Sequence, residues 1–492
     1  MCRHATYRSP LTSGNFTPKA VKSLSIRWWL SGVNSGRKTG VFTSSKSRTG
    51  EARALLKLAG PLIVNNLSIA GMQFADAVMA GRLGAEALAA VAVGGSVWFL
   101  GFTVCLGLMM AISPIAARHY GAGEPELIGR YTRQGLWLAV VLGLTIFTLA
   151  QLFVEPILTF LGIDEGFREL TIGYVRAIMF GALAICTFLA FRFTTEGIGF
   201  TRPIMFTSLF ALTCNVFLNW VLMFGKFGFP AYGAVGCGMA SAITMWLMAF
   251  VMGTYVALKP IYKPLKIFDH LAPVRMPVLK EIFALGTPIA VTITAEAGLF
   301  SAVSILVGTR GADITAAHQI SLNFAATMFM IPLALSAATT IRIGHALGSG
   351  NAAAARLGGM TGILMCIVFM SFSAAFLLLF RDLVVGIYTN DPSVTRIAIG
   401  LLLMAAVFQI ADGVQIGAAG ALRGYKDTRM PMVINTFSYW VLGFPLAYLA
   451  AITYQAPPTY IWAGFVLGLT VAAVLLTARF HILSKRMLLQ NA

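Results

Sequence analysis

Apolar residues along the chain fall into twelve long blocks that are separated by short polar joints. An α-helix rises about 1.5 Å per residue, so about 20 apolar residues cross a hydrocarbon core roughly 30 Å thick. Every block reaches this length, and the pattern predicts an all-α polytopic membrane protein with twelve transmembrane helices. The predicted helices lie at residues 54–80, 87–117, 131–153, 170–191, 203–225, 234–257, 281–308, 313–345, 360–381, 397–420, 430–451 and 458–480.

The composition excludes a soluble globular enzyme. Hydrophobic residues make up 58% of the 492 positions and charged residues only 11%, whereas soluble domains carry about a quarter charged residues. No HExxH, GxSxG, Walker-type or paired CxxC motif occurs in the sequence, so it lacks the usual constellations for hydrolysis, nucleotide binding or a metal cofactor. We expect no enzyme activity and no cofactor, and an ion gradient must then supply any energy for transport.

Lys and Arg residues are distributed unequally between alternate joints. With the N-terminus in the cytoplasm, the inner segments hold 29 of the 36 Lys and Arg residues and the outer joints hold seven. Basic joints are retained on the cytoplasmic side of a membrane, so we expect both termini to be cytoplasmic. The same topology accounts for the net charge of +18 without a nucleic-acid partner.

The first 50 residues differ from the rest of the chain. They contain nine Lys or Arg residues, no acidic residue and no long apolar run, which argues against a secretory signal peptide. We expect a disordered cytoplasmic extension at residues 1–50, or an over-extended start. The alternative is an organellar transit peptide, which is also Arg-rich, Ser-rich and poor in acidic residues.

The chain contains an internal repeat. After a shift of 227, residues 57–123 align with residues 284–350 without a gap, and 17 of the 67 aligned pairs are identical. Each half holds six predicted helices, an even number, so both halves start on the same side of the membrane as parallel repeats, as in two-lobed secondary transporters. We expect an N-lobe at 51–258, a proline-rich cytoplasmic linker at 259–280 and a C-lobe at 281–486.

Three carboxylates lie well inside apolar blocks, namely Asp76, Glu296 and Asp412. An ionised carboxylate in hydrocarbon costs at least about 2.5–3.5 kcal/mol, so such a group is protonated, binds a cation or has a buried partner. A carboxylate that exchanges H⁺ or Na⁺ as its surroundings change is suited to ion-coupled transport. Glu196, by contrast, lies at the end of a block beside Arg192, and we expect an interfacial ion pair there.

Polar residues near these carboxylates form two candidate clusters. Asn215 and Asn219 are four residues apart and share a helix face, so with Asp76 they offer the oxygen ligands that a hard cation prefers. The alternatives are hydrogen bonding between helices and, for Asp76, an ion pair with Arg82.

The second cluster lies in the C-terminal half. Gln409 lies beside Asp412, and Gln319 and Asn323 share one face of the block at 313–345, where His318 is a candidate proton relay. A hydrogen-bonded packing role is the alternative for His318.

Several motifs together resemble the multidrug and toxic compound extrusion (MATE) family, in particular its bacterial NorM-type branch. The resemblance covers about residues 51–485, and it is carried by Pro61, DAVMAG at 76–81, CNVFLNW at 214–220, GAVGCGMASAI at 233–243, AAHQISLNF at 316–324, IRIGHALGSG at 341–350 and GALRGYKDTRMP at 420–431. It implies a V-shaped exporter with two lobes of six helices that exchanges drugs for inward Na⁺ or H⁺.

The resemblance also implies roles for individual residues. Glu296 and Asp412 match the cation-binding acidic pair of the C-lobe, where Na⁺ binds in some members. Asp76, with Asn215 and Asn219, matches the N-lobe site where cation binding or protonation bends the first helix at a proline, here Pro61. Sodium-coupled members carry a Tyr where this chain has Phe408, which supplies no oxygen ligand and leaves H⁺ coupling or a differently completed Na⁺ site open.

These observations predict a cation-coupled multidrug antiporter that exports amphipathic, often cationic aromatic compounds by alternating access. We expect a monomer in contact with membrane lipids, located in a bacterial inner membrane. The alternatives are a flippase for a lipid-linked or amphipathic metabolite in the same superfamily and, less well supported, a membrane-embedded transferase.

Overall fold

The structure is a computed structural model that describes residues 47–269 and 273–490. The basic extension expected at residues 1–50 therefore lies almost entirely outside the described residues. The first described helix, α2 (Arg48–Gly81), begins after Ser47, whose side chain accepts a hydrogen bond from the backbone amide of Gly50 (3.2 Å) and so caps the helix.

The described residues of the first half form eight α-helices and one 3₁₀-helix. After α2 follow α3 (Ala85–Met110), α4 (Ile112–Ala122), α5 (Pro125–Phe160), α6 (Glu165–Met179), α7 (Ala182–Gly197), α8 (Arg202–Phe224), α9 (Gly233–Leu258) and η1 (Pro260–Leu265). We name α2–α9 the N-lobe.

The second half is likewise helical throughout its described residues. It consists of α10 (Met276–Gly308), α11 (Ala312–Gly348), α12 (Ala352–Tyr388), α13 (Pro392–Gly424), α14 (Arg429–Phe437), the π-helical turn η2 (Ser438–Gly443), α15 (Phe444–Tyr448), the π-helical turn η3 (Leu449–Thr453) and α16 (Pro458–Gln490). We name α10–α16 the C-lobe.

The prediction of an all-α membrane protein is confirmed. Eleven helices among the described residues are long and apolar enough to cross a membrane, and a bent pair makes twelve if it counts as one span. That pair, α6 and α7, occupies the block predicted as a single helix at 170–191 and bends by 43°. Gly181 lies at the bend, where a Cβ atom would collide with Met245 and Ala242 of α9, so close packing against α9 requires glycine there.

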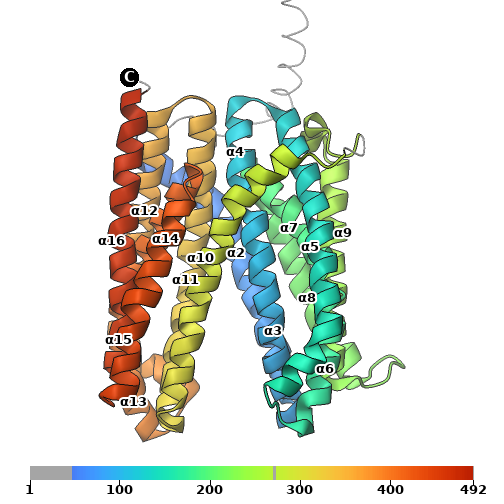
Figure 1. The fold of residues 1–492 in the computed structure, drawn as a ribbon, viewed down its shortest axis with the longest axis vertical. Helices are drawn as coiled ribbons and strands as arrows, with labels where there is room; N and C mark the ends of the chain where they lie inside the picture. Colours follow the sequence, from blue (N-terminus) through green and yellow to red (C-terminus); the bar gives the residue numbers. More distant parts are fainter. Residues whose placement is uncertain (1–46, 270–272, 491–492) are drawn as a thin grey trace, which may run out of the picture. The chain divides into compact units, whose positions relative to one another are not determined.

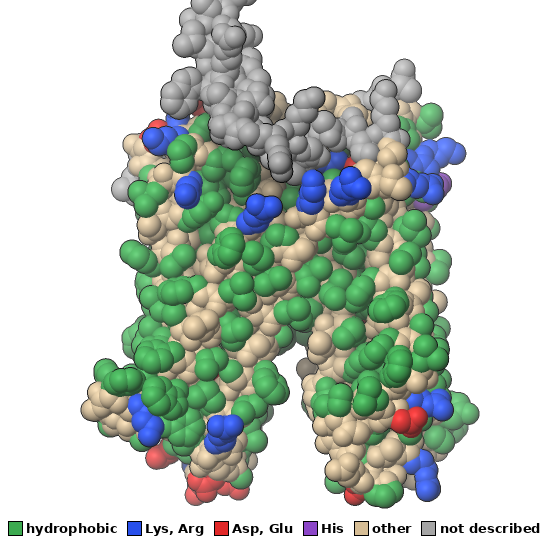
Figure 2. Space-filling view, turned by 180° about the vertical axis from the view of Figure 1, so that it is seen from behind, with side chains coloured by type: hydrophobic (Ala, Val, Ile, Leu, Met, Phe, Trp, Pro, Cys, Tyr) green, Lys and Arg blue, Asp and Glu red, His purple; other side chains and the backbone are tan. Residues whose placement is uncertain are grey.

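The two lobes lie side by side and diverge toward one end. α11 packs against α2 and α4, and α3 packs against α10, so each lobe contributes to a shared interface. Figure 1 shows the helices of the two lobes spreading apart toward the lower end of the view, where α6 and α13 lie. In Figure 2 a notch opens between the lobes at that same end, whereas a row of Lys and Arg side chains runs across the opposite end.

The lobes meet through segments that the internal repeat relates to each other. A Cβ atom at Gly344 would lie 2.6 Å from the Cβ atom of Ala117, and the two positions differ by the repeat shift of 227. Gly121 and Gly348, which the same shift relates, approach so closely that a Cβ atom at Gly348 would lie 2.9 Å from the Cα atom of Gly121. The ends of α4 and α11 therefore cross backbone to backbone, which only residues without a side chain allow.

Each lobe buries its own apolar core and exposes apolar side chains on its outer surface. The larger clusters centre on Tyr174 and Val175 in the N-lobe and on Trp462 and Phe465 in the C-lobe. Large side chains such as Phe250 (72%) and Phe372 (70%) are mostly exposed, as expected for surfaces that contact lipid rather than water.

Candidate functional site

Asp76 is held in a hydrogen-bonded cluster between α2, α8 and α9. Its Oδ1 accepts a hydrogen bond from Asn219 Nδ2 (2.5 Å) and its Oδ2 accepts one from Ser241 Oγ (3.3 Å). Asn219 Nδ2 also lies 3.3 Å from Asn215 Oδ1, and Asn215 Nδ2 lies 3.4 Å from Ser241 Oγ. The structure thus brings together Asp76, Asn215 and Asn219 as the sequence predicted, and it adds Ser241.

Asp76 has no basic partner in this cluster. Within residues 47–269 and 273–490, no ion pair joins Asp76 to Arg82 or to another basic side chain, and Arg82 is exposed at the end of α2. The carboxylate is held by neutral donors alone, so its charge is available to an ion or a ligand.

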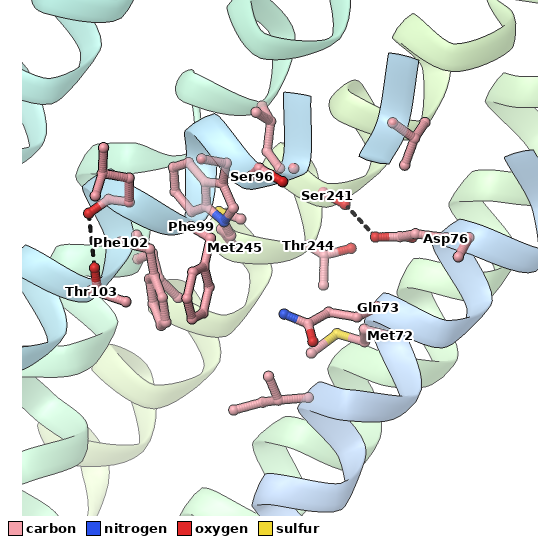
Figure 3. Close-up of a pocket in the computed structure, with 18 of the residues that line it drawn as sticks. Met72, Gln73, Asp76, Ser96, Phe99, Phe102, Thr103, Ser241, Thr244 and Met245 are labelled. Carbon is pink, nitrogen blue, oxygen red and sulfur yellow. Dashed lines mark hydrogen bonds between the residues drawn. The ribbon is translucent and has the colours of Figure 1, made fainter. Parts of the chain in front are cut away.

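Asp76 lies on the wall of a cavity of about 740 Å³ that is lined mostly by N-lobe residues, with α10 of the C-lobe forming part of the wall. This volume falls within the range of about 300–1,000 Å³ that is usual for pockets that bind small molecules. Aromatic and sulfur-containing side chains form much of the wall, among them Met72, Trp98, Phe99, Phe102, Phe188 and Met245. Figure 3 shows Asp76 and Ser241 on one side of the cavity, with Phe99, Phe102 and Met245 on the other.

The C-lobe carboxylates Glu296 and Asp412 lie on α10 and α13 and interact electrostatically. Asp412 is buried (4% exposed), and its Oδ1 has no hydrogen-bond partner among the described residues. No ion pair with Lys, Arg or His involves either carboxylate in the described part of the chain. Neither carboxylate is therefore locked to a basic residue.

Tyr439 was not predicted from the sequence as part of this acidic pair. Its side chain is fully buried in the π-helical turn η2 and interacts electrostatically with both Glu296 and Asp412. Phe408, in contrast, packs edge-on against Trp462 and Phe465, with ring centroids 5.8 and 6.0 Å apart. Position 408 therefore contributes an apolar ring to the core, and the Tyr439 hydroxyl lies on a different helical segment.

The auxiliary polar residues lie in different surroundings. Gln409 is buried, and its Oε1 accepts a hydrogen bond from Ser373 Oγ (2.7 Å). Gln319 Nε2 donates to Asn323 Oδ1 (3.3 Å), so the predicted shared face exists, and both side chains are exposed.

His318 uses both ring nitrogens in packing. Trp462 Nε1 donates to its Nδ1 (3.0 Å), and its Nε2 lies 3.1 Å from Ser304 Oγ. Because Nδ1 accepts a hydrogen bond, the ring is neutral and its proton lies on Nε2. This geometry supports the packing alternative over a proton relay.

Pro61 lies inside α2, which continues through it as one helix. Proline removes a backbone donor and weakens the helix locally. One turn later Asn66 Nδ2 donates to the backbone oxygen of Met330 on α11 (3.2 Å). The structure therefore has a locally weakened segment beside a contact between the lobes, and bending at Pro61 stays a prediction.

Polar contacts join the lobes at the end opposite the notch. Arg342 of α11 donates to both carboxylate oxygens of Glu51 on α2 (2.8 and 2.6 Å). His345 Nε2 lies 2.7 Å from the backbone oxygen of Gly197. Glu281 of α10 accepts a hydrogen bond from the hydroxyl of Tyr131 and binds Lys426 Nζ (2.8 Å).

Comparison with known proteins agrees with this architecture. A family model described as MatE matches residues 61–221 and 288–449. A "Multidrug resistance protein MdtK" from Photorhabdus laumondii is 38% identical over 433 residues, which cover 87% of this chain and 95% of that protein. A "Multidrug resistance protein NorM" from Vibrio vulnificus is 36% identical over 441 residues, covering 89% and 96%.

Solved structures share the fold. The eukaryotic MATE transporter AtDTX14 superposes with a TM-score of 0.80 at 22% identity, covering 90% of this chain and all of that one. A MATE protein crystallised in a bent conformation superposes with a TM-score of 0.83 at 20% identity, covering 93% of this chain and all of that one.

Two lobes of membrane-spanning helices, with carboxylates inside the spans that form no ion pair among the described residues, define an integral, multi-pass secondary transporter and not an enzyme. Among such transporters, the chain belongs to the MATE family, because the family model covers most of its two halves and its relatives match nearly their whole length.

Proposed function

We propose that this protein exports amphipathic, often cationic aromatic compounds from the cytoplasm in exchange for inward H⁺ or Na⁺. The observation that carries this proposal is the carboxylate of Asp76, which has no basic partner, on the wall of a largely apolar cavity of about 740 Å³ that includes several aromatic side chains. Aromatic faces attract organic cations, and a carboxylate in a low-dielectric cavity binds one positive charge at a time. The names of the relatives, which are multidrug resistance proteins, agree with this substrate class.

Competition for one negative charge couples the two fluxes. A coupling ion and a cationic drug that both need Asp76 exclude each other, which is an unfavourable (positive) coupling free energy between the two ligands. An inward monovalent cation releases about 2.3 kcal/mol per 100 mV of membrane potential. Export of a monocationic drug costs the same energy, because its charge moves outward against the same potential, so in a one-for-one exchange the concentration gradient of the ion drives export.

The C-lobe pair supports a second site for the coupling ion. Glu296 and Asp412 offer carboxylate oxygens, and the buried Tyr439 interacts electrostatically with both. Oxygen ligands of this kind suit Na⁺, and two interacting carboxylates without a basic partner also suit the uptake of a proton.

The distribution of charge supports an orientation with both termini in the cytoplasm of a bacterial inner membrane. The row of Lys and Arg side chains lies at the end opposite the notch, and basic segments are retained on the cytoplasmic side. In this orientation the notch faces outward and the contacts between the lobes close the cytoplasmic side.

Transport in proteoliposomes tests the proposal. Purified protein is reconstituted, Na⁺ and pH gradients are imposed separately, and uptake of a fluorescent aromatic cation is followed. We expect one gradient to drive uptake, and we expect Asp76→Asn to abolish gradient-driven uptake while Asp382→Asn, at an exposed position of α12, leaves it unchanged. Uptake by Asp76→Asn equal to that of the wild type would overturn the assignment of Asp76.

A further inference from the structure

Three arginines cluster where the linker between the lobes meets α5. Arg130 and Arg133 lie three residues apart in α5, and Arg275 lies directly before α10. Arg133 is repelled electrostatically by the other two guanidinium groups. Among the described residues, none of the three arginines forms an ion pair with a carboxylate.

The carboxylates near this cluster do not neutralise it. Asp269 attracts Arg133, but it also interacts electrostatically with Lys266. Glu126 is bound by Lys266 Nζ (2.7 Å). The Nε atom of Arg133 is buried and has no hydrogen-bond partner in the described part of the chain. The cluster therefore carries excess positive charge and unused donors, which an oxyanion is suited to accept.

Hydrogen bonds to the linker hold the arginines together despite their repulsion. Gln134 is fully buried in α5; its Nε2 donates to the backbone oxygen of Pro273 (2.9 Å), and its Oε1 accepts from the backbone amide of Arg275 (2.8 Å). Arg133 Nη1 donates to the backbone oxygen of Lys266. Like charges that are held close together destabilise a protein, so a bound anion would remove a cost that this arrangement carries.

A stripe of exposed side chains continues from the arginines along α5 toward the middle of the membrane. Arg130, Arg133, Trp137, Val141 and Leu144 follow one another at intervals of three or four residues, which places them on one face of the helix. Trp137 is 36% exposed, Val141 58% and Leu144 50%. Tryptophan is typical of the boundary between headgroups and hydrocarbon. The stripe thus offers cations, an interfacial ring and apolar side chains in the order in which a lipid carries its headgroup, glycerol backbone and acyl chains.

This order favours a membrane lipid over a soluble anion. A free phosphate would contact the arginines alone, whereas an anionic lipid would contact the arginines and the apolar stripe together. Figure 2 shows that hydrophobic side chains lie directly below the row of Lys and Arg side chains at this end of the molecule. Basic groups between helices on the cytoplasmic side of membrane proteins bind anionic headgroups in this way.

The cluster draws on both lobes. Arg130 and Arg133 belong to the N-lobe, whereas Arg275 precedes the first helix of the C-lobe. α5 packs against α10, and Figure 1 shows the upper part of α10 leaning toward α5. An anion that binds all three arginines therefore connects the lobes at the end where they are in contact.

We propose that Arg130, Arg133 and Arg275 bind the phosphate headgroup of an anionic membrane lipid, and that the bound lipid stabilises the contact between α5 and α10. Arginine suits this role because its planar guanidinium binds phosphate through two hydrogen bonds and is weakly hydrated. The inference does not depend on the substrate or the coupling ion proposed above. It uses the proposed orientation only to place the lipid in the cytoplasmic leaflet.

A lipid titration tests the site. Dioleoylphosphatidylglycerol or dioleoylphosphatidylcholine is added to the purified full-length protein in detergent, and native mass spectrometry gives the Kd of the first bound lipid. The variants are Arg130→Gln, Arg133→Gln and Arg275→Gln. The matched control is Arg486→Gln, which removes the same charge at an exposed position near the end of α16 (Pro458–Gln490).

We expect the wild type to bind phosphatidylglycerol at least about ten-fold more tightly than phosphatidylcholine. Each of the three variants should weaken phosphatidylglycerol binding about five-fold, as the loss of one basic charge beside a headgroup predicts, and leave phosphatidylcholine binding unchanged. Arg486→Gln should leave both Kd values unchanged. Should Arg133→Gln loosen the linker, Arg130→Gln and Arg275→Gln still decide the question.

The effect on the lobes is measured in nanodiscs by double electron–electron resonance. Spin labels are placed at Leu258 of α9 and Leu489 of α16 in a variant without native cysteines. Replacing part of the phosphatidylcholine by phosphatidylglycerol should shorten the distances in the wild-type background and not in Arg133→Gln/Arg275→Gln. The same distances with and without phosphatidylglycerol in the wild-type background would overturn the stabilising role of the lipid.

Equal wild-type affinity for the two lipids would overturn the lipid site, and so would a loss in Arg486→Gln as large as that in the other variants. Displacement of phosphatidylglycerol by ammonium phosphate, but not by ammonium acetate of the same ionic strength, would assign the cluster to a soluble phosphate instead. The proposed function fails separately, if neither a Na⁺ nor a pH gradient drives uptake into proteoliposomes while the lipid titration gives the expected Kd values.

Discussion

The ion pair between Glu51 and Arg342 offers a direct test of how the lobes are held together. Both side chains are buried, at 2% and 7% exposed, and the guanidinium binds both carboxylate oxygens. Removing one partner of a buried pair leaves the other charge uncompensated and costs about 3–5 kcal/mol. Glu51 belongs to the N-lobe and Arg342 to the C-lobe. Removing one partner therefore mainly destabilises the conformation in which the lobes are in contact at this end.

Glu51→Gln should therefore shift the population toward conformations in which the lobes are separated at this end. A loss of about 3 kcal/mol corresponds to a change of roughly a hundredfold in the conformational equilibrium constant. The double variant Glu51→Gln/Arg342→Gln should cost less than the sum of the single variants, because it leaves no uncompensated charge.

Double electron–electron resonance measures the distance between the lobes. Spin labels are placed at Leu258, at the end of α9, and at Leu489, near the end of α16, which are 71% and 72% exposed, after the six native cysteines have been replaced. We expect longer distances in Glu51→Gln and a lower Tm. The control is Asp427→Asn, which breaks the pair with Arg479 inside the C-lobe (2.8 Å) and should leave the distance distribution unchanged.

The reasoning would be refuted if Glu51→Gln left both the distance distribution and the Tm at wild-type values. It would also be refuted if Asp427→Asn lengthened the distances as much as Glu51→Gln did. In either case the pair between the lobes would not control their separation.

Three further predictions concern the C-lobe and the crossing of α4 and α11. Glu296→Gln and Asp412→Asn should each abolish drug efflux from a sensitive bacterial strain at equal expression, and undiminished efflux would reject their role in coupling. Tyr439→Phe should raise the half-saturating concentration of the coupling ion in proteoliposomes about ten-fold without a change in Tm, since it removes a buried hydroxyl that interacts electrostatically with both carboxylates; an unchanged concentration would exclude Tyr439 from the ion site. Gly348→Val should destabilise the closed crossing by about 1–3 kcal/mol, as overpacking does, and a thermal shift assay that finds the wild-type Tm would contradict the backbone contact with Arg118 and Ala122.

Much of the fold was predictable because the bilayer imposes a length and a composition on each helix. The twelve apolar blocks and the repeat shift of 227 are visible in the sequence alone. The bend between α6 and α7 could not be predicted, because it depends on how closely Gly181 approaches α9. The sequence pattern at 170–191 gives no information about that distance.

The candidate site was predictable where its residues share a helix and unpredictable where they do not. The spacing of Asn215 and Asn219 places them on one face of α8. Asp76 was identified because an ionised carboxylate inside an apolar span is energetically costly. Ser241 and Tyr439 were missed as site residues because lateral packing of other helices brings them into place, and the same packing places Arg192 on the wall of the cavity. A basic residue near a helix end, such as Arg192, is usually read as an interfacial ion pair, and the structure shows that pair to be loose, at 3.9 Å.

The crossing of α4 and α11 has a consequence for how the molecule is assembled. Ala117 meets Gly344 and Gly121 meets Gly348, so each half presents the same surface to its counterpart, as the two subunits of an isologous dimer do. The protein can be regarded as a dimer whose subunits have been fused into one polypeptide. If so, the halves made as two separate chains, cut between η1 and α10, should find each other in the membrane and restore one working molecule.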